Sequence, residues 1–198
     1  MLSVIKPKVE PLISLIASPF LRFDPNVLTL IGLVPPVLFF IFLVSGNKLA
    51  ALLSLLGVIF DFIDGYVARK TNRVTAFGGL LDSTIDRVAD ALLIAAFGFA
   101  GIVAWEFVVL LIILSYLISY IRSRAELAAK SAFKLDVGII ERSERLLGIV
   151  IITAASAFDI NIRGNLSIAE FLYILLCLLS FITVVQRLLI ARKRLENY

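Results

Sequence analysis

Residues 61–86 read Asp61-Phe-Ile-Asp64-Gly-Tyr-Val-Ala-Arg, eight residues, Gly, three residues, Asp82, three residues and Asp86. Asp61 and Asp64 are three positions apart, and Asp82 and Asp86 are four apart. On helices the members of each pair share a face, with Cβ atoms about 5–6 Å apart. Two such helices that face each other would bring four carboxylates together. Without a cation these charges would repel one another strongly in a low dielectric.

A cluster of four carboxylates predicts a divalent metal site. Mg²⁺ or Mn²⁺ is expected, because hard cations take oxygen ligands. Gly65 and Gly78 leave space for a ligand close to the backbone, and Arg69 can bind phosphate oxygens. The alternative is four separate aspartates, each solvated at a helix end or paired with an arginine. Charged groups in membrane segments are costly and usually functional, which favours the shared site.

The composition is that of an integral membrane protein. The chain of 198 residues is 61% hydrophobic and 17% charged, and its mean hydropathy is +1.03. A transmembrane helix needs about 20 mostly apolar residues, and several stretches qualify. The sequence contains no His, which excludes a His base or ligand, and its single cysteine, Cys177, excludes an intrachain disulfide.

Residues 1–24 predict an amphipathic helix that lies in the membrane interface. Prolines and Glu10 interrupt this stretch, which argues against a signal peptide. An irregular leader is the alternative. The apolar residues that recur at helical spacing are Val9, Leu12, Ile13, Ile16 and Phe20.

Residues 25–198 predict a bundle of six transmembrane helices, so that the whole chain forms one all-α domain. The expected spans are 27–45, 49–69, 78–101, 104–120, 146–158 (with a helical extension back to 140) and 167–190. Pro35-Pro36 should kink the first span, which neighbouring helices in a bundle tolerate. The expected connections are a basic loop at 70–77, a polar, basic loop with a short helix at 122–140, and a turn at 159–165.

The basic residues predict the orientation of this bundle. With both termini on one side, every Lys and Arg of the 19 falls on that side, except Lys48 and Arg163. Lys and Arg are enriched in cytoplasmic loops. We therefore expect a multi-pass protein of the cell membrane whose termini and aspartate cluster are cytoplasmic. A site there would be open to soluble nucleotides and also to lipid tails in the membrane plane.

The segment 61–86 resembles the signature of the CDP-alcohol phosphotransferases, Asp-x2-Asp-Gly-x2-Ala-Arg-x8-Gly-x3-Asp-x3-Asp. It matches at each of the eight fixed positions. The resemblance extends over the whole chain. It implies a displacement at phosphorus in which an alcohol attacks a CDP-activated lipid and CMP leaves. It also implies a homodimer and a site with Mg²⁺ or Mn²⁺, expected as two ions.

The resemblance assigns roles to the signature residues. Asp61, Asp64 and Asp82 are the expected principal metal ligands, and Asp86 is the expected base, with a further contact to the second metal. The family's Pro-Asn-x-x-Thr segment is also matched, at 25–29, although its polar residues could instead cap a helix. The residues expected to contact the nucleotide or the CDP-lipid are Gly65, Ala68, Arg69, Thr75, Gly78, Asn26 and Thr29.

Basic residues near the fourth and fifth spans are expected to bind a phosphorylated acceptor, because arginine forms bidentate hydrogen bonds with phosphate. Glu141 and Glu144 are expected to orient these arginines, and Asp90 to pair with an arginine or polar residue rather than with a metal. The alternative is a set of membrane anchors and Arg–Glu pairs. The candidate acceptor residues are Arg122, Arg124, Lys130, Arg142 and Arg145.

Segments 119–126 and 136–146 resemble the inositol-phosphate branch of the family. This implies transfer from CDP-archaeol or CDP-diacylglycerol to 1L-myo-inositol 1-phosphate. Glycerol 3-phosphate is the nearest rival acceptor, since it too needs a phosphate clamp. A membrane prenyltransferase and a cation transporter that uses the aspartates are the alternatives from other classes. No nucleic-acid partner is expected.

Overall fold

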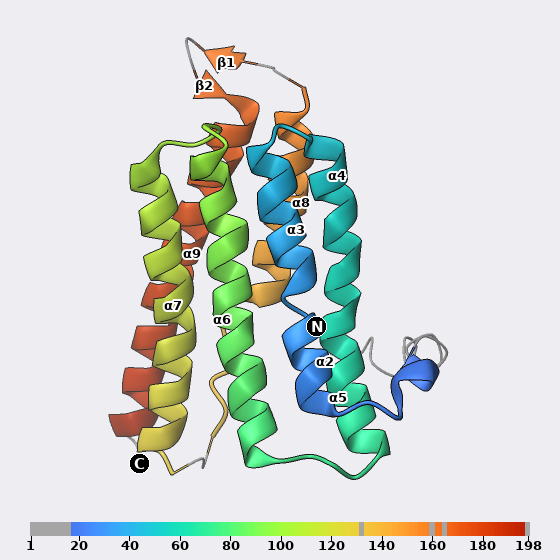
Figure 1. Cartoon of the computed structure of the whole chain (residues 1–198). Coiled ribbons are helices and arrows are strands. Elements are labelled where there is room, and N and C mark those ends of the chain that lie inside the picture. The colour runs from blue at the N-terminus through green and yellow to red at the C-terminus, as the bar shows by residue number, and fades with distance from the viewer. Residues whose placement is uncertain (1–16, 131–132, 159–160, 164–165, 197–198) are drawn as a thin grey trace.

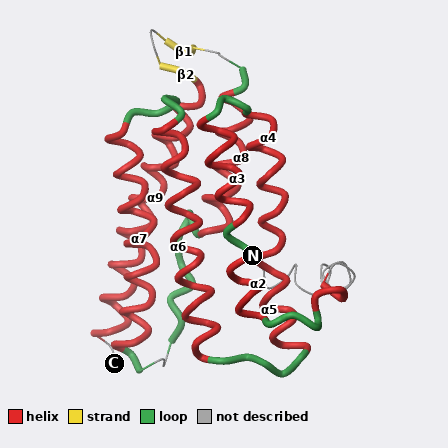
Figure 2. Tube along the Cα trace, viewed as in Figure 1, coloured by secondary structure: helices red, strands yellow, loops and turns green. Residues whose placement is uncertain are grey.

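The computed structural model describes residues 17–130, 133–158, 161–163 and 166–196. Long helical segments run side by side as a bundle, with a small strand pair at one end (Figures 1 and 2). The elements are η1 (Ser18–Phe20), α2 (Pro25–Ile31), α3 (Val34–Val44), α4 (Lys48–Ser54), η2 (Leu55–Ile59), α5 (Phe60–Lys70), α6 (Ala76–Phe99), α7 (Trp105–Ala128), α8 (Arg142–Ser156), β1 (Asn161–Arg163), β2 (Leu166–Ser167) and α9 (Ile168–Glu196).

The prediction of a helical membrane protein is confirmed. Four stretches of the described chain are long and apolar enough to span a bilayer: Pro25–Val44, Lys48–Lys70, Trp105–Ala128 and Ile168–Glu196. α6 carries several charged side chains, and α8 has 15 residues, fewer than the roughly 20 that a span needs. The number of six spans therefore stays a prediction.

The first two apolar stretches are interrupted at the same level of the bundle. α2 ends at Ile31 and α3 begins at Val34, with prolines in its first turn, where their missing N–H groups leave no hydrogen bond unmade. In the second stretch, α4 passes through the 3-10 turn η2 before α5 begins. A Cβ on Gly57 in η2 would lie 2.6 Å from Pro35 Cγ. The absence of a side chain at Gly57 therefore allows η2 to pack directly on α3.

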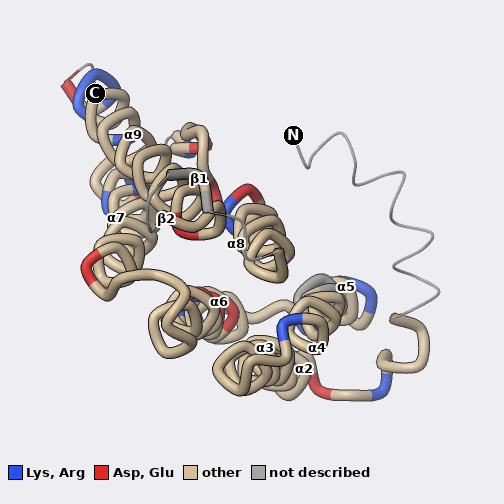
Figure 3. Tube along the Cα trace, turned by 90° about the horizontal axis from the view of Figure 1, so that it is seen from above, with Lys and Arg blue, Asp and Glu red and all other residues tan. Residues whose placement is uncertain are grey.

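α6 occupies the middle of the bundle. Viewed along the axis, it lies between the group α2–α5 and the group α7–α9 (Figure 3). The N-terminal half of α6 carries Asp82, Asp86 and Arg87, whereas most of its buried residues lie in the C-terminal half. Phe97 is fully buried and packs edge-on against Tyr173 of α9, with 5.5 Å between ring centroids. Burial of such a side chain contributes about 1.5–3 kcal/mol, so this aromatic contact anchors the apolar end of α6.

Among the helix boundaries that differ from the sequence prediction, two change the positions of arginines. A loop was expected from residue 122, but α7 continues to Ala128. An ion pair of 3.1 Å between Arg122 and Glu126, one helical turn apart, stabilises this last part of the helix. α8 begins at Arg142 rather than at 140. Glu141 and Glu144 form a capping box that fixes this start. Glu144 therefore caps the helix instead of orienting an arginine.

The remaining differences lie at the ends of the chain and of the bundle. The turn expected at 159–165 contains the strand β1, which pairs antiparallel with β2 directly after that range, so that Asn161 opposes Ser167. α9 extends to Glu196, six residues beyond the expected end at 190. The interfacial helix expected at 1–24 falls mostly on residues 1–16, which lie outside the described chain. Within residues 17–24 only the short helix η1 is present.

Candidate active site

The start of α6 is fixed by the residues of the signature loop. Thr75 is its N-cap, and its hydroxyl accepts a hydrogen bond of 3.0 Å from the Gly78 N–H. A Cβ on Gly78 would lie 3.1 Å from Thr75 Oγ1 and 3.3 Å from Asn26 Oδ1. Both contacts are tight, so glycine at this position lets the first turn of α6 approach α2.

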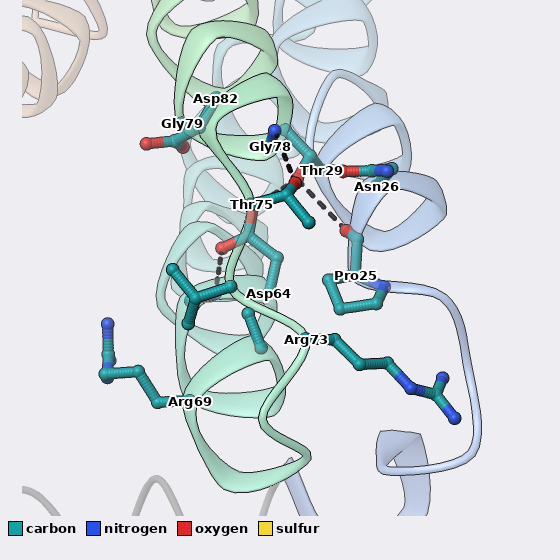
Figure 4. A pocket seen from close by; sticks show the side chains of 13 residues that line it. Pro25, Asn26, Thr29, Asp64, Arg69, Arg73, Thr75, Gly78, Gly79 and Asp82 are labelled. Carbon is teal, nitrogen blue, oxygen red and sulfur yellow. Dashed lines mark hydrogen bonds between the residues drawn. The ribbon is translucent and has the colours of Figure 1, made fainter.

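A cavity of about 460 Å³ lies between α2, α5 and the start of α6. We call it the aspartate cavity. In Figure 4 the Arg69 and Arg73 side chains extend on opposite sides of it. Every residue that the resemblance assigns to the nucleotide lines this cavity, and so do Asp64 and Asp82. Its lining is Pro25, Asn26, Thr29, Asp64, Gly65, Ala68, Arg69, Arg73, Val74, Thr75, Gly78, Gly79 and Asp82.

Asp64 is buried and held by α2. Its Oδ2 lies 2.6 Å from the Thr29 hydroxyl, which also lies 3.0 Å from the Pro25 carbonyl oxygen, and its Oδ1 accepts the Gly65 N–H. A bond this short is typical of a hydroxyl that donates to a charged carboxylate. Asp24, not Asn26 or Thr29, caps α2. Thr29 therefore orients a signature carboxylate instead of capping a helix.

The expected four-carboxylate cluster is only partly within the described side chains. Asp61 lies in α5, but its side chain is outside the described part of the chain. Among the described side chains, no group of three Asp, Glu or Cys residues could hold a metal ion. Asp64 and Asp82, which share the aspartate cavity, supply the oxygen donors that Mg²⁺ and Mn²⁺ prefer, so the donor set fits such an ion. The complete metal site stays a prediction.

Asp86 faces a different set of side chains. One turn beyond Asp82 on α6, its Oδ1 lies 2.8 Å from Arg142 Nη1, and its Oδ2 lies 3.8 Å from Arg87 Nη2. Asp86 does not line the aspartate cavity. Asp86 therefore lies on the part of α6 that faces the first arginine of α8.

A second cavity, of about 490 Å³, lies on the other side of α6. We call it the arginine cavity, because five arginines and one glutamate supply its ionised side chains. Such an excess of positive charge suits a phosphorylated ligand. Its lining is Val58, Arg87, Ile118, Ser119, Arg122, Ser123, Glu141, Arg142, Ser143, Arg145, Leu146 and Arg187.

The structure brings together some of the expected acceptor residues and not others. Arg122, Arg142 and Arg145 line the arginine cavity, whereas Arg124 and Lys130 do not. Arg124 is exposed on the last turns of α7, and Lys130 follows that helix with a positive φ of 48°. The roles of all five residues stay predictions.

Arg87 and Arg187 line the arginine cavity but were not among the expected acceptor residues. Arg187 is only 3% exposed. The signal available in the sequence was an arginine within an apolar helix, because charged residues in membrane segments are seldom without function. Its Nε donates to the Val137 carbonyl at 2.8 Å, and its Nη1 to the Ile118 carbonyl at 2.6 Å. Its Nη2 donates to Glu141 at 3.0 Å. Arg187 thus joins α7, α9 and the loop before α8.

Asp90 lies on α6 one turn beyond Asp86 and is 5% exposed. It forms an ion pair and hydrogen bond with Arg145 Nη2. Its carboxylate oxygens also lie 3.7 Å from Arg142 Nε and 4.0 Å from Arg87 Nη1. The expected pairing of Asp90 with arginine is present, and all of its partners line the arginine cavity.

The family model of CDP-alcohol phosphatidyltransferases matches residues 23–185, which include the lining residues of both cavities except Arg187. The chain belongs to the CDP-alcohol phosphatidyltransferase family. It is therefore an enzyme, a phosphotransferase, and the prenyltransferase and transporter alternatives are set aside.

Several relatives carry the names of inositol-phosphate lipid synthases. The archaetidylinositol phosphate synthase of Pyrococcus horikoshii is 39% identical and is matched over 99% of both chains. The crystal structure of Mycobacterium tuberculosis phosphatidylinositol phosphate synthase with CDP-DAG bound is similar at a TM-score of 0.76 and 28% identity, over 90% of this chain and 92% of that one. The same enzyme in complex with manganese and citrate gives a TM-score of 0.74 at 28% identity, over 90% and 88% of the chains.

Proposed function

We propose that this phosphotransferase joins a CDP-activated lipid, CDP-archaeol or CDP-diacylglycerol, to 1L-myo-inositol 1-phosphate and releases CMP. The observation that carries the proposal is the arginine cavity beside the signature aspartates of α6, because the second substrate must itself bear a phosphate to suit five arginines. Relatives named archaetidylinositol and phosphatidylinositol phosphate synthase support the choice of inositol phosphate.

The aspartate cavity is the proposed place of the CDP-lipid. Asn26 and Thr29 of α2 would contact the cytidine, and Arg69 at the end of α5 would bind diphosphate oxygens. Gly65 and Gly78 keep this wall free of side chains. A Cβ on Gly65 would lie 3.2 Å from Arg69 Nη1, so a side chain at this position would crowd the Arg69 guanidinium.

Asp61, Asp64 and Asp82 are the proposed metal ligands, with Mg²⁺ or Mn²⁺ as the proposed cofactor and two ions as the proposed number. A related enzyme has been solved in complex with manganese. When bound, such ions neutralise the diphosphate and stabilise the charge that develops on the leaving oxygen. Thr29 would hold Asp64 ready for this role through its 2.6 Å hydrogen bond.

Asp86 is the proposed general base. It stands on α6 between the two cavities, where a hydroxyl of the acceptor would meet the lipid phosphate. The carboxylate takes the hydroxyl proton as the oxygen forms its bond to the lipid phosphorus. The bond from that phosphorus to the bridging oxygen breaks, and CMP leaves with the electron pair. Arg142, whose Nη1 lies 2.8 Å from Asp86 Oδ1, would hold the carboxylate in place.

The six-span topology with both termini and the cavities on the cytoplasmic side is part of the proposal. It rests on the distribution of Lys and Arg. The α5–α6 connection and the C-terminal end of α9 lie at the same end of the bundle, and the strand pair lies at the opposite end (Figure 1). A homodimer is proposed from the family resemblance alone. Light scattering of the purified protein in detergent tests it, and a monomeric mass would contradict it.

The proposed reaction is tested by CMP release from CDP-archaeol or CDP-diacylglycerol in liposomes with Mg²⁺ or Mn²⁺. Inositol 1-phosphate, free inositol, glycerol 3-phosphate and serine are supplied in separate reactions. We expect release that depends on inositol 1-phosphate. Release that depends only on glycerol 3-phosphate would replace the acceptor in the proposal, and release with serine or free inositol alone would contradict the role of the arginine cavity.

A further inference from the structure

Asp90 lies outside the signature, yet its carboxylate lies within ion-pair distance of three arginines that line the arginine cavity. We propose that Asp90 is a positioning residue, which fixes Arg87, Arg142 and Arg145 so that they bind the phosphate of the acceptor. This inference deepens the proposed function and rests on the acceptor being phosphorylated, not on the acceptor being inositol phosphate.

The contacts of Asp90 divide between its two oxygens. Oδ2 pairs with Arg145 Nη2 from α8 and lies 4.0 Å from Arg87 Nη1 on its own helix. Oδ1 lies 3.7 Å from Arg142 Nε, at the first turn of α8. One carboxylate thus fixes guanidinium groups from two helices. Because its side chain is only 7% exposed, solvent screens these pairs little.

Arg145 is the partner for which this fixing matters most. It is 1% exposed, and within the described chain its Nε and Nη1 have no hydrogen-bond partner. A buried donor without a partner is costly, so these N–H groups favour a ligand that accepts hydrogen bonds. Since Arg145 lines the arginine cavity, a phosphate there would meet donors that Asp90 has already oriented.

Arg187 provides the contrast within the same cavity. All three of its side-chain nitrogens donate to the protein itself, two of them to backbone carbonyls. Arg187 is therefore occupied in holding the fold, whereas Arg145 keeps donors for a ligand. Asp90, through Arg145, acts on the substrate-binding part of the cavity.

Two effects of an Asp90→Asn substitution have opposite signs, which makes the inference testable. If Asp90 acted only through its charge, its removal would leave the cavity more positive and would strengthen the binding of an anion. If Asp90 positions the arginines, its removal lets them move and weakens the binding of phosphate. The KM of the acceptor therefore rises for a positioning residue and falls for a purely electrostatic one.

The experiment measures CMP release by wild type and Asp90→Asn, with the phosphorylated acceptor that supports turnover in wild type and with CDP-lipid varied separately. We expect the KM of the acceptor to rise about tenfold while its kcat stays within about threefold and the KM of CDP-lipid is unchanged. An acceptor KM that stays equal or falls would overturn the inference. A wild type that turns over with no phosphorylated acceptor would overturn the proposed function as well.

A double-mutant cycle with Arg145→Gln separates positioning from a general loss of structure. If Asp90 acts through Arg145, the double variant raises the acceptor KM no more than Arg145→Gln alone. Independent, multiplying effects would contradict the coupling. Should Asp90→Asn fail to fold, Arg145→Gln alone decides, because an unchanged acceptor KM in that variant overturns the inference.

Thr153→Val is the matched control on α8. Thr153 is 1% exposed and donates to the Ile149 carbonyl within its own helix, away from both cavities. Loss of a buried hydroxyl there tests what disturbance of the packing of α8 does by itself. We expect it to leave the acceptor KM unchanged, and a rise equal to that of Asp90→Asn would contradict a specific role for Asp90.

Discussion

The Thr29 hydroxyl of α2 lies 2.6 Å from Asp64 Oδ2 of α5. This hydrogen bond joins the Pro-Asn-x-x-Thr segment to the aspartate signature across 35 positions of sequence. Thr29 is only 7% exposed although its helix is apolar, and the hydrogen bond to the buried Asp64 carboxylate gives its hydroxyl a partner there. The two sequence motifs therefore build one wall of the aspartate cavity.

Thr29→Val should weaken that wall without removing a carboxylate. A hydrogen bond to a charged group contributes about 1.5–3 kcal/mol, so we expect the Mn²⁺ concentration for half-maximal CMP release to rise about tenfold or more. Thr71→Val, directly after the end of α5, is the control, since the Thr71 hydroxyl bonds only to the Val67 carbonyl of α5 among the contacts described. Equal metal dependence in Thr29→Val and wild type would contradict the role given to Thr29.

Gly78→Ala should displace the first turn of α6 from α2. The added Cβ would stand 3.1 Å from Thr75 Oγ1 and 3.3 Å from Asn26 Oδ1, so these side chains must move. We expect kcat/KM for CDP-lipid to fall about tenfold, as for a contact worth about 1.4 kcal/mol in the transition state. The Cβ of Gly79→Ala meets no atom within 4 Å, so kcat/KM for CDP-lipid should fall less in this variant. An equal loss in both variants would argue against the close approach at Gly78.

Arg187→Gln should lower stability. It removes donors from two backbone carbonyls and from Glu141, and unpaired buried groups cost about 1–3 kcal/mol each. We expect the free energy of unfolding to fall by about 3 kcal/mol, seen as a lower Tm in detergent. Arg192→Gln is the control, because its ion pair with Glu196 is exposed and should contribute less than about 1 kcal/mol. A Tm equal to wild type in Arg187→Gln would show that this residue does not hold the helices together.

Asp86→Asn tests the assignment of the base. The amide keeps the size of the side chain but cannot accept the hydroxyl proton, so we expect kcat to fall at least 100-fold, within the range of general base catalysis. Binding of CDP-lipid should remain, as measured by its KM or by thermal protection. Turnover at the wild-type rate in this variant would remove Asp86 as the base.

Much of the fold could be predicted from residue pattern alone. The apolar runs and the spacing of the aspartates predict helices in the right order. They also predict that α5 and α6 face each other directly, whereas in the structure α2 packs against both helices and the aspartate cavity lies between them. The kink expected at Pro35-Pro36 corresponds to the break between α2 and α3 at Gly32–Leu33, directly before these prolines. The 3-10 turn η2 in the second apolar stretch could not be placed, because Gly57 packs there against Pro35 of another helix. The strand pair at 161–167 shows no alternating apolar pattern and was therefore expected as a turn.

The two halves of the site differ in how far the sequence could define them. The aspartate cavity is built from one contiguous signature and a nearby motif, so most of its lining could be named in advance, although Arg73, Val74 and Gly79 were not. The arginine cavity draws on α6, α7, α8 and α9, and which arginines meet there depends on the helix ends. Arg124 was expected in the cavity because the loop was placed too early. Arg187 was counted only as an orientation signal, although its burial gave it another role.

The central claim is that carboxylates from α5 and α6 hold the same metal ions at the aspartate cavity. The most direct measurement is Mn²⁺ binding by electron paramagnetic resonance in wild type, Asp64→Asn and Asp82→Asn, each in detergent and without CDP-lipid. We predict that either substitution weakens tight Mn²⁺ binding, because both aspartates are ligands of one site. Wild-type Mn²⁺ affinity in either variant would contradict the account.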